Sequence, residues 1–112
     1  MPDDIFCRIA NHQLNATYVY EDEDVVAIED INPGAPSHVL VIPKQHYDNV
    51  RALDNPALLG KMFATAHRVA EQKGMEASGY RLVFNVGPDA GQSVDHVHLH
   101  VLGGRRMSWP PG

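Results

Sequence analysis

Cysteine is almost absent from this chain, which limits how the fold can be held together. Cys7 is the single cysteine among 112 residues, so no disulfide can form within the chain, and the composition suits a reducing compartment. No apolar run is long enough to span a membrane, and the acidic N-terminus has no apolar signal core. We therefore expect a cytoplasmic protein without membrane contact.

Positive charge is scarce as well. Nine Lys and Arg residues stand against 14 Asp and Glu residues, for a net charge of -5. No basic stripe is present, which argues against polymeric nucleic acid as a partner but leaves a mononucleotide open. With 112 residues, 44% of them hydrophobic, and no internal repeat, we expect one domain over residues 1–112 with a small core.

Apolar periodicity predicts an α+β fold. Alternating or continuous apolar stretches predict strands at residues 17–20, 24–28, 38–42, 80–86 and 93–102. A helical repeat from Pro56 to Lys73 predicts one long helix, and residues 5–10 predict a short N-terminal helix capped by Asp3 or Asp4. Short connections favour antiparallel pairing. The expected fold is a five-stranded antiparallel, meandering sheet with the long helix packed on it.

Histidine is concentrated near the C-terminus. His96, His98 and His100 alternate with Val97 and Leu99, a spacing that places three imidazoles on one face of a strand. Imidazole can act as base, acid, nucleophile or metal ligand near neutral pH. A solvated strand face is the plain alternative, but three ordered imidazoles beside a Gly-Gly turn serve packing poorly. We therefore expect this segment to carry chemistry.

The segment from His96 to Leu102 fits the pattern His-φ-His-φ-His-φ-φ, where φ is apolar, and so resembles the histidine triad (HIT) family. Further landmarks along the whole chain resemble the Hint branch of that family: Phe6, Tyr20-Glu21-Asp22, Asp30-Ile31-Asn32-Pro33, Ala35-Pro36-Ser37-His38, Val41-Ile42-Pro43-Lys44 and Trp109-Pro110-Pro111-Gly112. The resemblance implies a HIT-like fold. It also implies a nucleotide hydrolase that cleaves the P–N bond of purine nucleoside 5'-phosphoramidates, with adenosine 5'-monophosphoramidate as the model substrate, through a covalent nucleotidyl-histidine intermediate.

The resemblance implies that His98 is the nucleophile. A neutral imidazole attacks phosphorus when one nitrogen is free and the other is held as an N–H donor, for example by a neighbouring main-chain carbonyl. The resemblance further implies that His100 and His38 contact the phosphate or orient the nucleophile, and His96 completes the catalytic set. For His38 the alternative is a strand-start histidine that caps the sheet edge. Asp95, directly before the triad, is expected to raise the pKa of a neighbouring imidazole.

A loop over residues 87–93 is expected on the phosphate side of the site. Glycines such as Gly91 let main-chain N–H groups approach an anion, while Asn85, Gln92 and Ser93 add neutral donors. Ser93 is also placed to donate a proton or hydrogen bond to a departing amine. An ordinary β-turn is the alternative for this loop.

The nucleoside is expected to bind on the other side of the triad. Asp30, at a strand end, can accept both ribose hydroxyls; its alternative role is to cap the next turn. The resemblance implies an apolar slot for the base, and the same residues could equally be core: Phe6, Ile9, Leu14, Ile28 and Ile31.

Some relatives bind zinc through a Cys-x-x-Cys pair and two histidines. Here Asp4 stands at the first position and Cys7 at the second, and His46 and His96 complete a candidate set whose residue types all bind zinc. Helix capping is the alternative role of Asp4. The reaction requires no metal, so a zinc at this set would be structural. A metalloenzyme that uses the triad itself as ligands is a separate alternative.

The stiff ending from Trp109 to Gly112 is the last landmark. The Hint resemblance implies a homodimer in which this tail packs near the active site of the second subunit. The expected partners are therefore purine nucleoside monophosphate derivatives and a second copy of the chain. An alternative function with the same pocket is a nucleotide-binding regulatory or scaffold protein whose catalysis is vestigial.

Overall fold

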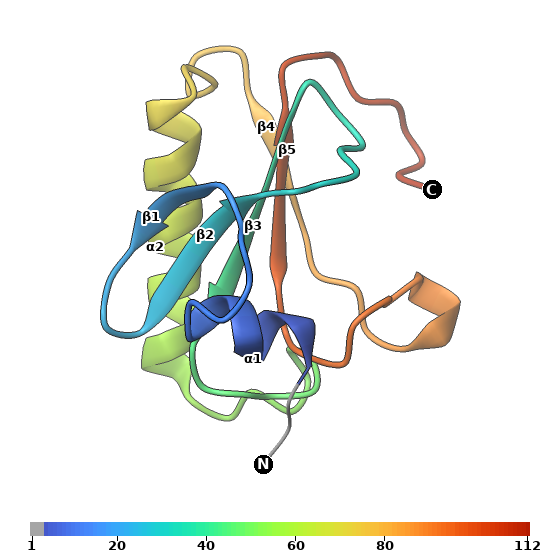
Figure 1. The fold of residues 1–112 in the computed structure, drawn as a ribbon. Coiled ribbons are helices and arrows are strands. Elements are labelled where there is room, and N and C mark those ends of the chain that lie inside the picture. Colours follow the sequence, from blue (N-terminus) through green and yellow to red (C-terminus); the bar gives the residue numbers. More distant parts are fainter. Residues whose placement is uncertain (1–3) are drawn as a thin grey trace.

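The computed structural model describes residues 4–112 and has the predicted α+β architecture (Figure 1). A five-stranded antiparallel sheet carries one long helix and one short N-terminal helix. The elements in chain order are α1 (Ile5–Ala10), β1 (Tyr18–Glu21), β2 (Val25–Glu29), β3 (Ser37–Pro43), α2 (Pro56–Gln72), β4 (Tyr80–Val83), the 3-10 turn η1 (Pro88–Ala90) and β5 (Leu99–Gly103).

The strand order is β1-β2-β3-β5-β4, so the expected meander is wrong at the connection from β3 to β4. Both β3 and β4 pair with β5 in antiparallel fashion, which makes β3 and β4 parallel to each other. A parallel crossover through α2 leaves β4 one strand away from β3, and β5 fills the gap. His100 on β5 therefore lies opposite Leu40 on β3, in the interior of the sheet.

Alternation along β2 and β3 divides the buried side chains between the two faces of the sheet. Val25, Ala27 and Val41 pack toward α2 with Met62 and Val69. The alternate residues of β2 and β3 point to the opposite face and form a second cluster with three residues of α1. The strand residues are Val26, Ile28, Leu40 and Ile42, and the α1 residues are Phe6, Ile9 and Ala10. The period of two along a strand thus gives the α1 face its own small core.

Both helices begin at side-chain caps. Asp4 Oδ1 accepts a hydrogen bond from the Cys7 N–H at 2.7 Å, and Asn55 Oδ1 accepts one from the Leu58 N–H at 3.1 Å. Each cap stabilises its helix by about 1 kcal/mol. Asp3, the other cap considered, lies outside the described residues.

Strand β5 begins at Leu99, not at Ser93 as expected. The preceding segment bonds elsewhere: the Val97 N–H donates to the carbonyl of Tyr47 at 2.7 Å, in the loop after β3. His96 and His98 therefore precede the strand. β4 likewise ends at Val83, before the expected residue 86. Among the described residues, none of the helices has the length and apolar character needed to cross a membrane.

Candidate active site

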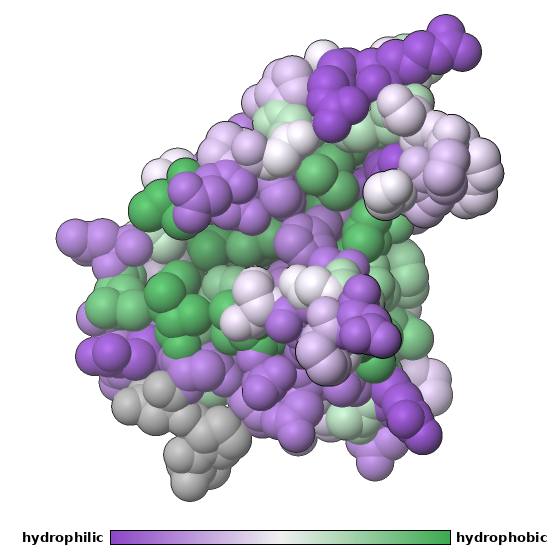
Figure 2. Space-filling view, turned by 90° about the vertical axis from the view of Figure 1, so that its right-hand side faces the viewer, coloured by the Kyte–Doolittle hydropathy of each residue, from purple (hydrophilic) through white to green (hydrophobic). Residues whose placement is uncertain are grey.

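A cavity of about 640 Å³ lies between α1, the end of β2 and the segment before β5. The molecular face in Figure 2 is hollowed, and apolar residues gather in its recess. The apolar wall of the cavity contains all five residues expected to hold the base: Phe6, Ile9, Leu14, Ile28 and Ile31. Four of these residues are also core or packed on it, whereas Ile31 is 91% exposed. Asp30, Ser93, His98 and His100 add polar groups to the lining.

His98 is held by a single main-chain acceptor. Its Nδ1–H donates to the carbonyl oxygen of His96 at 2.7 Å, and its ring packs edge-on against Phe6. Burial lowers the pKa of His98 and outweighs the hydrogen bond to the His96 carbonyl, which raises it, so the ring is neutral at pH 7. A neutral ring with its proton on Nδ1 keeps a lone pair on Nε2, as expected of a nucleophile.

The main chain also fixes the proton of His38, and His38 in turn fixes that of His100. The Gly34 N–H donates to His38 Nδ1 at 2.8 Å, so neutral His38 carries its proton on Nε2. That proton points to His100 Nδ1 at 2.8 Å, with Asp30 Oδ2 at 3.3 Å. Burial, together with His98 and His38, lowers the pKa of His100 to about 4. His100 is therefore neutral with its proton on Nε2, a buried donor that has no partner within residues 4–112.

Asp30 takes the capping role considered for it, and its other oxygen is directed at His38. Oδ1 accepts the Asn32 N–H at 2.9 Å and caps the turn after β2, while Oδ2 faces His38. Asp30, His38 and His100 lie close enough to suggest a metal site. His38 cannot offer Nε2 to a cation while Gly34 donates to its Nδ1, so this group does not fit a metal.

The loop over residues 87–93, and Asn85 before it, were expected on the phosphate side of the site. The Gln92 side chain is not a free donor: Oε1 accepts the Gly87 N–H at 2.9 Å, and Nε2 donates to the carbonyls of Asp48 at 2.6 Å and Val94 at 3.0 Å. Asn85 and Gly91 are not among the described residues that line the cavity. Ser93 lines the cavity and is exposed, so it remains the donor that the loop offers.

Asp4, Cys7, His46 and His96 converge, with ligand atoms within 4.8 Å of one another. Cys7 Sγ lies 3.4 Å from His96 Nδ1 and 3.6 Å from His46 Nδ1. Asp4 Oδ2 lies 3.0 Å from His46 Nδ1 and 3.2 Å from His96 Nδ1. Asp4 is thus helix cap and candidate ligand at once.

The outer nitrogens of both rings are already engaged. His96 Nε2–H donates to the Pro43 carbonyl at 2.9 Å, and His46 Nε2–H donates to Asp48 Oδ1 at 2.8 Å. Both Nδ1 lone pairs therefore face Cys7 and Asp4, and such outer acceptors are typical of zinc-bound histidines. One thiolate, one carboxylate and two imidazoles form an acceptable tetrahedral zinc set.

The triad histidines therefore do not form one ligand set, since His96 faces α1 while His98 and His100 face the cavity. This contradicts the metalloenzyme alternative. The expectation for Asp95 is also wrong: Asp95 is exposed, and the pKa values of His98 and His100 are lowered.

The family model of the HIT domain matches residues 11–107, which include His38, His98 and His100. The chain belongs to the HIT domain family. This HIT protein is 48% identical to the 14 kDa zinc-binding protein of Zea mays over 113 residues, covering 96% of this chain and 87% of that protein.

Solved structures of HIT proteins share its fold. A HIT family hydrolase from Legionella pneumophila has a TM-score of 0.95 and 45% identity, with 98% of this chain and 100% of that chain covered. A HIT family hydrolase from Clostridium thermocellum has a TM-score of 0.93 and 46% identity, with 96% of both chains covered. These similarities make the chain a HIT family hydrolase-like protein.

Sequence reasoning missed two residues that organise the site of this HIT protein. Gly34 fixes the tautomer of His38 through its main-chain N–H, and no side-chain pattern can reveal such a contact. Asp48 supports His46, and here a signal existed, because the spacing His-x-Asp places a carboxylate near the ring. Leu40 and Val94, both expected only as strand residues, also line the cavity.

Proposed function

We propose that this HIT protein belongs to the Hint branch and hydrolyses the P–N bond of purine nucleoside 5'-phosphoramidates. The observation that carries the proposal is the hydrogen bond from His98 Nδ1 to the His96 carbonyl, at 2.7 Å, on a ring that lines the cavity. It leaves Nε2 of a neutral, buried imidazole as the nucleophile.

In the first step His98 Nε2 attacks phosphorus, a P–Nε2 bond forms, and the P–N bond to the amine breaks. The departing amine takes a proton, for which Ser93 at the cavity edge is the nearest hydroxyl of the loop. In the second step water attacks phosphorus, the P–Nε2 bond breaks, and the proton that the water loses replaces the one that Ser93 gave to the amine. The products are a nucleoside monophosphate, a free amine and the original His98.

His100 supplies the main charge stabilisation in this scheme. Its buried Nε2–H has no protein partner among residues 4–112, and a buried donor without a partner is costly, on the order of 1 to 3 kcal/mol. A phosphate oxygen would accept that hydrogen bond, and charge gathers on this oxygen as phosphorus is attacked. His38 and Gly34 hold the donor in place.

Two further proposals concern the assembly and its cofactor. A structural zinc would be held by Asp4, Cys7, His46 and His96, and would fix α1 against the segment before β5; no reacting atom needs it. The active unit is a cytoplasmic homodimer, since Trp109 is 82% exposed and offers a large apolar surface to a second copy. Neither polymeric nucleic acid nor a membrane is part of the proposal.

A nucleotide-binding regulatory or scaffold role is the second candidate. It is favoured by the name of the relative from Zea mays, which records zinc binding and no reaction. The cavity would then bind a purine nucleotide without turnover.

One assay separates these candidates. Turnover of adenosine and guanosine 5'-phosphoramidates is measured after extended dialysis against a strong chelator and again with Zn²⁺ restored. We expect turnover to persist without metal, within a few-fold of the zinc-loaded value. Nucleotide binding without turnover in either state would favour the regulatory candidate, and activity that vanished and returned with Zn²⁺ would place the metal in the reaction.

A further inference from the structure

Gln92 is hydrogen-bonded both to Val94, which lines the cavity, and to Asp48, which contacts His46 of the set formed by Asp4, Cys7, His46 and His96. Its side-chain amide makes three hydrogen bonds to main-chain groups: it accepts from Gly87 and donates to Asp48 and Val94. Its own N–H donates to the Gly87 carbonyl at 3.1 Å. Because both amide hydrogens are used within the chain, Gln92 cannot donate to a ligand without releasing one of these contacts.

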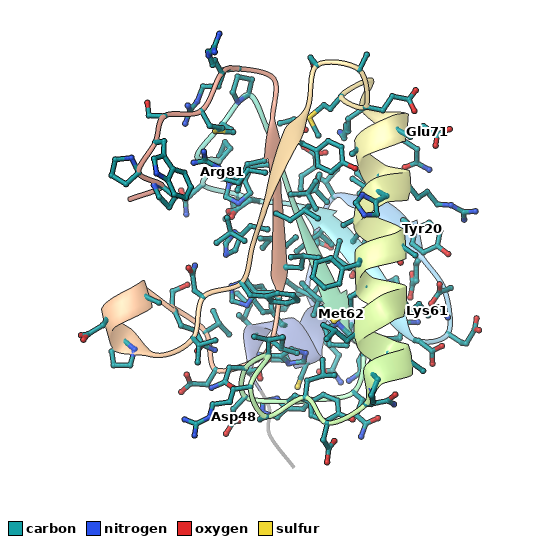
Figure 3. All side chains as sticks on the ribbon, turned by 180° about the vertical axis from the view of Figure 1, so that it is seen from behind. Tyr20, Asp48, Lys61, Met62, Glu71 and Arg81 are labelled. Atoms are coloured by element: carbon teal, nitrogen blue, oxygen red, sulfur yellow. The ribbon has the colours of Figure 1, made fainter. Side chains whose placement is uncertain are left out.

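On one side, Gln92 is connected to the candidate metal set through Asp48. The carboxylate of Asp48 accepts from His46 Nε2 at 2.8 Å, and the main-chain carbonyl of the same residue accepts from Gln92 Nε2 at 2.6 Å. The Asp48 side chain is 72% exposed, so its hydrogen bond to the His46 ring is weak when no cation holds that ring. A cation on His46 Nδ1 would fix that ring and strengthen Nε2–H as a donor. In Figure 3 Asp48 is labelled at the bottom of the view, at the end of the molecule opposite Glu71.

On the other side, Gln92 closes the loop that leads into the cavity. Gly87 and Gly91 both have a positive φ, of 81° and 82°, and η1 between them has no side-chain cap. The residues directly after Gln92 are Ser93 and Val94, and both line the cavity. Among the described residues, the side-chain hydrogen bonds that hold this loop are those of Gln92.

We propose that Gln92 is a positioning residue that couples the metal state of the four-residue set to the order of residues 87–94, through His46 and Asp48. Binding of Zn²⁺ at the set stiffens the loop and holds Ser93 at the cavity. The role of Ser93 rests on the proposed function above, whereas the coupling itself does not.

Amide hydrogen exchange of residues 87–94, with and without Zn²⁺, tests the coupling and needs no substrate. In the wild-type chain we expect Zn²⁺ to slow exchange in this loop several-fold. Asp48→Ala removes the carboxylate on His46 but keeps the carbonyl that Gln92 uses. In Asp48→Ala, the amides of residues 87–94 should exchange as fast as in the metal-free wild type, and added Zn²⁺ should leave their exchange unchanged. Asp54→Ala, at an exposed aspartate of the same connection, is the matched control and should respond as the wild type does.

A second variant tests Gln92 directly. Gln92→Glu keeps an acceptor for the Gly87 N–H and loses both donors, so its loop should exchange rapidly in both metal states. Gln72→Glu, exposed at the end of α2, controls for the added charge. Calorimetry with Zn²⁺ alone measures binding, which should persist in Gln92→Glu.

Three results would overturn the coupling: no Zn²⁺ binding by the wild type, binding without slower loop exchange, or an Asp48→Ala response equal to that of the wild type. Zn²⁺-slowed loop exchange in Gln92→Glu would remove the role of Gln92. A chain that shows the coupling but no phosphoramidate turnover would refute the proposed hydrolase function and leave this inference standing.

Discussion

The proposed role of His98 Nε2 as nucleophile depends on one main-chain carbonyl, that of His96, which holds the proton on Nδ1. Because the ring is buried against Phe6 and neutral, its replacement removes the attacking lone pair without adding a buried charge. We expect His98→Ala to lower turnover of adenosine 5'-phosphoramidate by several orders of magnitude while nucleotide binding, measured by calorimetry, survives. His67→Ala, at an exposed histidine on α2 beside Tyr80, is the control. A loss of turnover of only a few-fold would contradict the assignment of His98 as the covalent nucleophile.

Asp30 is expected to select ribose over deoxyribose. Its Oδ1 is committed to the Asn32 N–H and its Oδ2 faces His38 at the cavity, so a bound ribose offers donors to a carboxylate that is already oriented. Loss of one hydroxyl leaves an acceptor unpaired, at a cost on the order of 1 to 3 kcal/mol, or roughly 5- to 150-fold. The measurement is kcat/KM for adenosine 5'-phosphoramidate against its 2'-deoxy analogue. Equal values would remove Asp30 from the ribose site.

At the residue scale, the sequence predicted which residues carry the chemistry better than it predicted the contacts that these residues make. Four of the expected polar site residues line the cavity: Asp30, Ser93, His98 and His100. They could be predicted because the family pattern specifies residue types at a fixed spacing. Gln92 was expected as a donor to the phosphate, whereas its amide bonds main-chain groups; an amide can bond a ligand or the main chain equally well, and only the fold decides. Side-chain chemistry is readable locally, whereas its partners belong to distant segments.

At the element scale, the turn between β1 and β2 is held by Asp22. Partial burial of this carboxyl opposes ionisation, but hydrogen bonds from the Asp24 and Val25 N–H groups, Tyr20 and Lys61 outweigh it and lower the pKa of Asp22 to about 2. The Asp22 carboxylate therefore stabilises the fold above its unfolded pKa of 3.8, and this contribution is lost as pH falls toward 2.

Asp22→Asn tests this acid dependence. We expect the variant to be less stable than the wild type at pH 7 by about 1 to 2 kcal/mol, and the gap to close between pH 4 and pH 2. Urea unfolding across this pH range gives both quantities, and the exposed Asp89→Asn serves as the control. A difference in the free energy of unfolding that stayed the same at every pH would show that the Asp22 charge is not what stabilises the turn.

The elements themselves were largely readable from the sequence, and their order in the sheet was not. The caps Asp4 and Asn55 and the apolar repeat of α2 are local signals, so both helices were found nearly to the residue. The position of β5 between β3 and β4 depends on the α2 crossover, a property of the whole chain. The segment before β5 was misread as strand because its alternation is strand-like while its hydrogen bonds go to the loop after β3.

At the scale of the whole molecule, the C-terminal tail is expected to shape the site of a second copy. Within the described chain the tail is held by a hydrogen bond from Arg81 to the Ser108 carbonyl at 2.9 Å, and Trp109 is 82% exposed. Deleting residues 108–112 should therefore leave the unfolding midpoint nearly unchanged, because little buried surface is lost. It should alter selectivity among leaving amines, since the tail of one subunit would border the cavity of the other. The measurement is kcat/KM for phosphoramidates that differ only in the amine, with the oligomeric state followed by light scattering. A fully active monomer at micromolar concentration would refute the dimer, and an unchanged amine preference would remove the tail from the site.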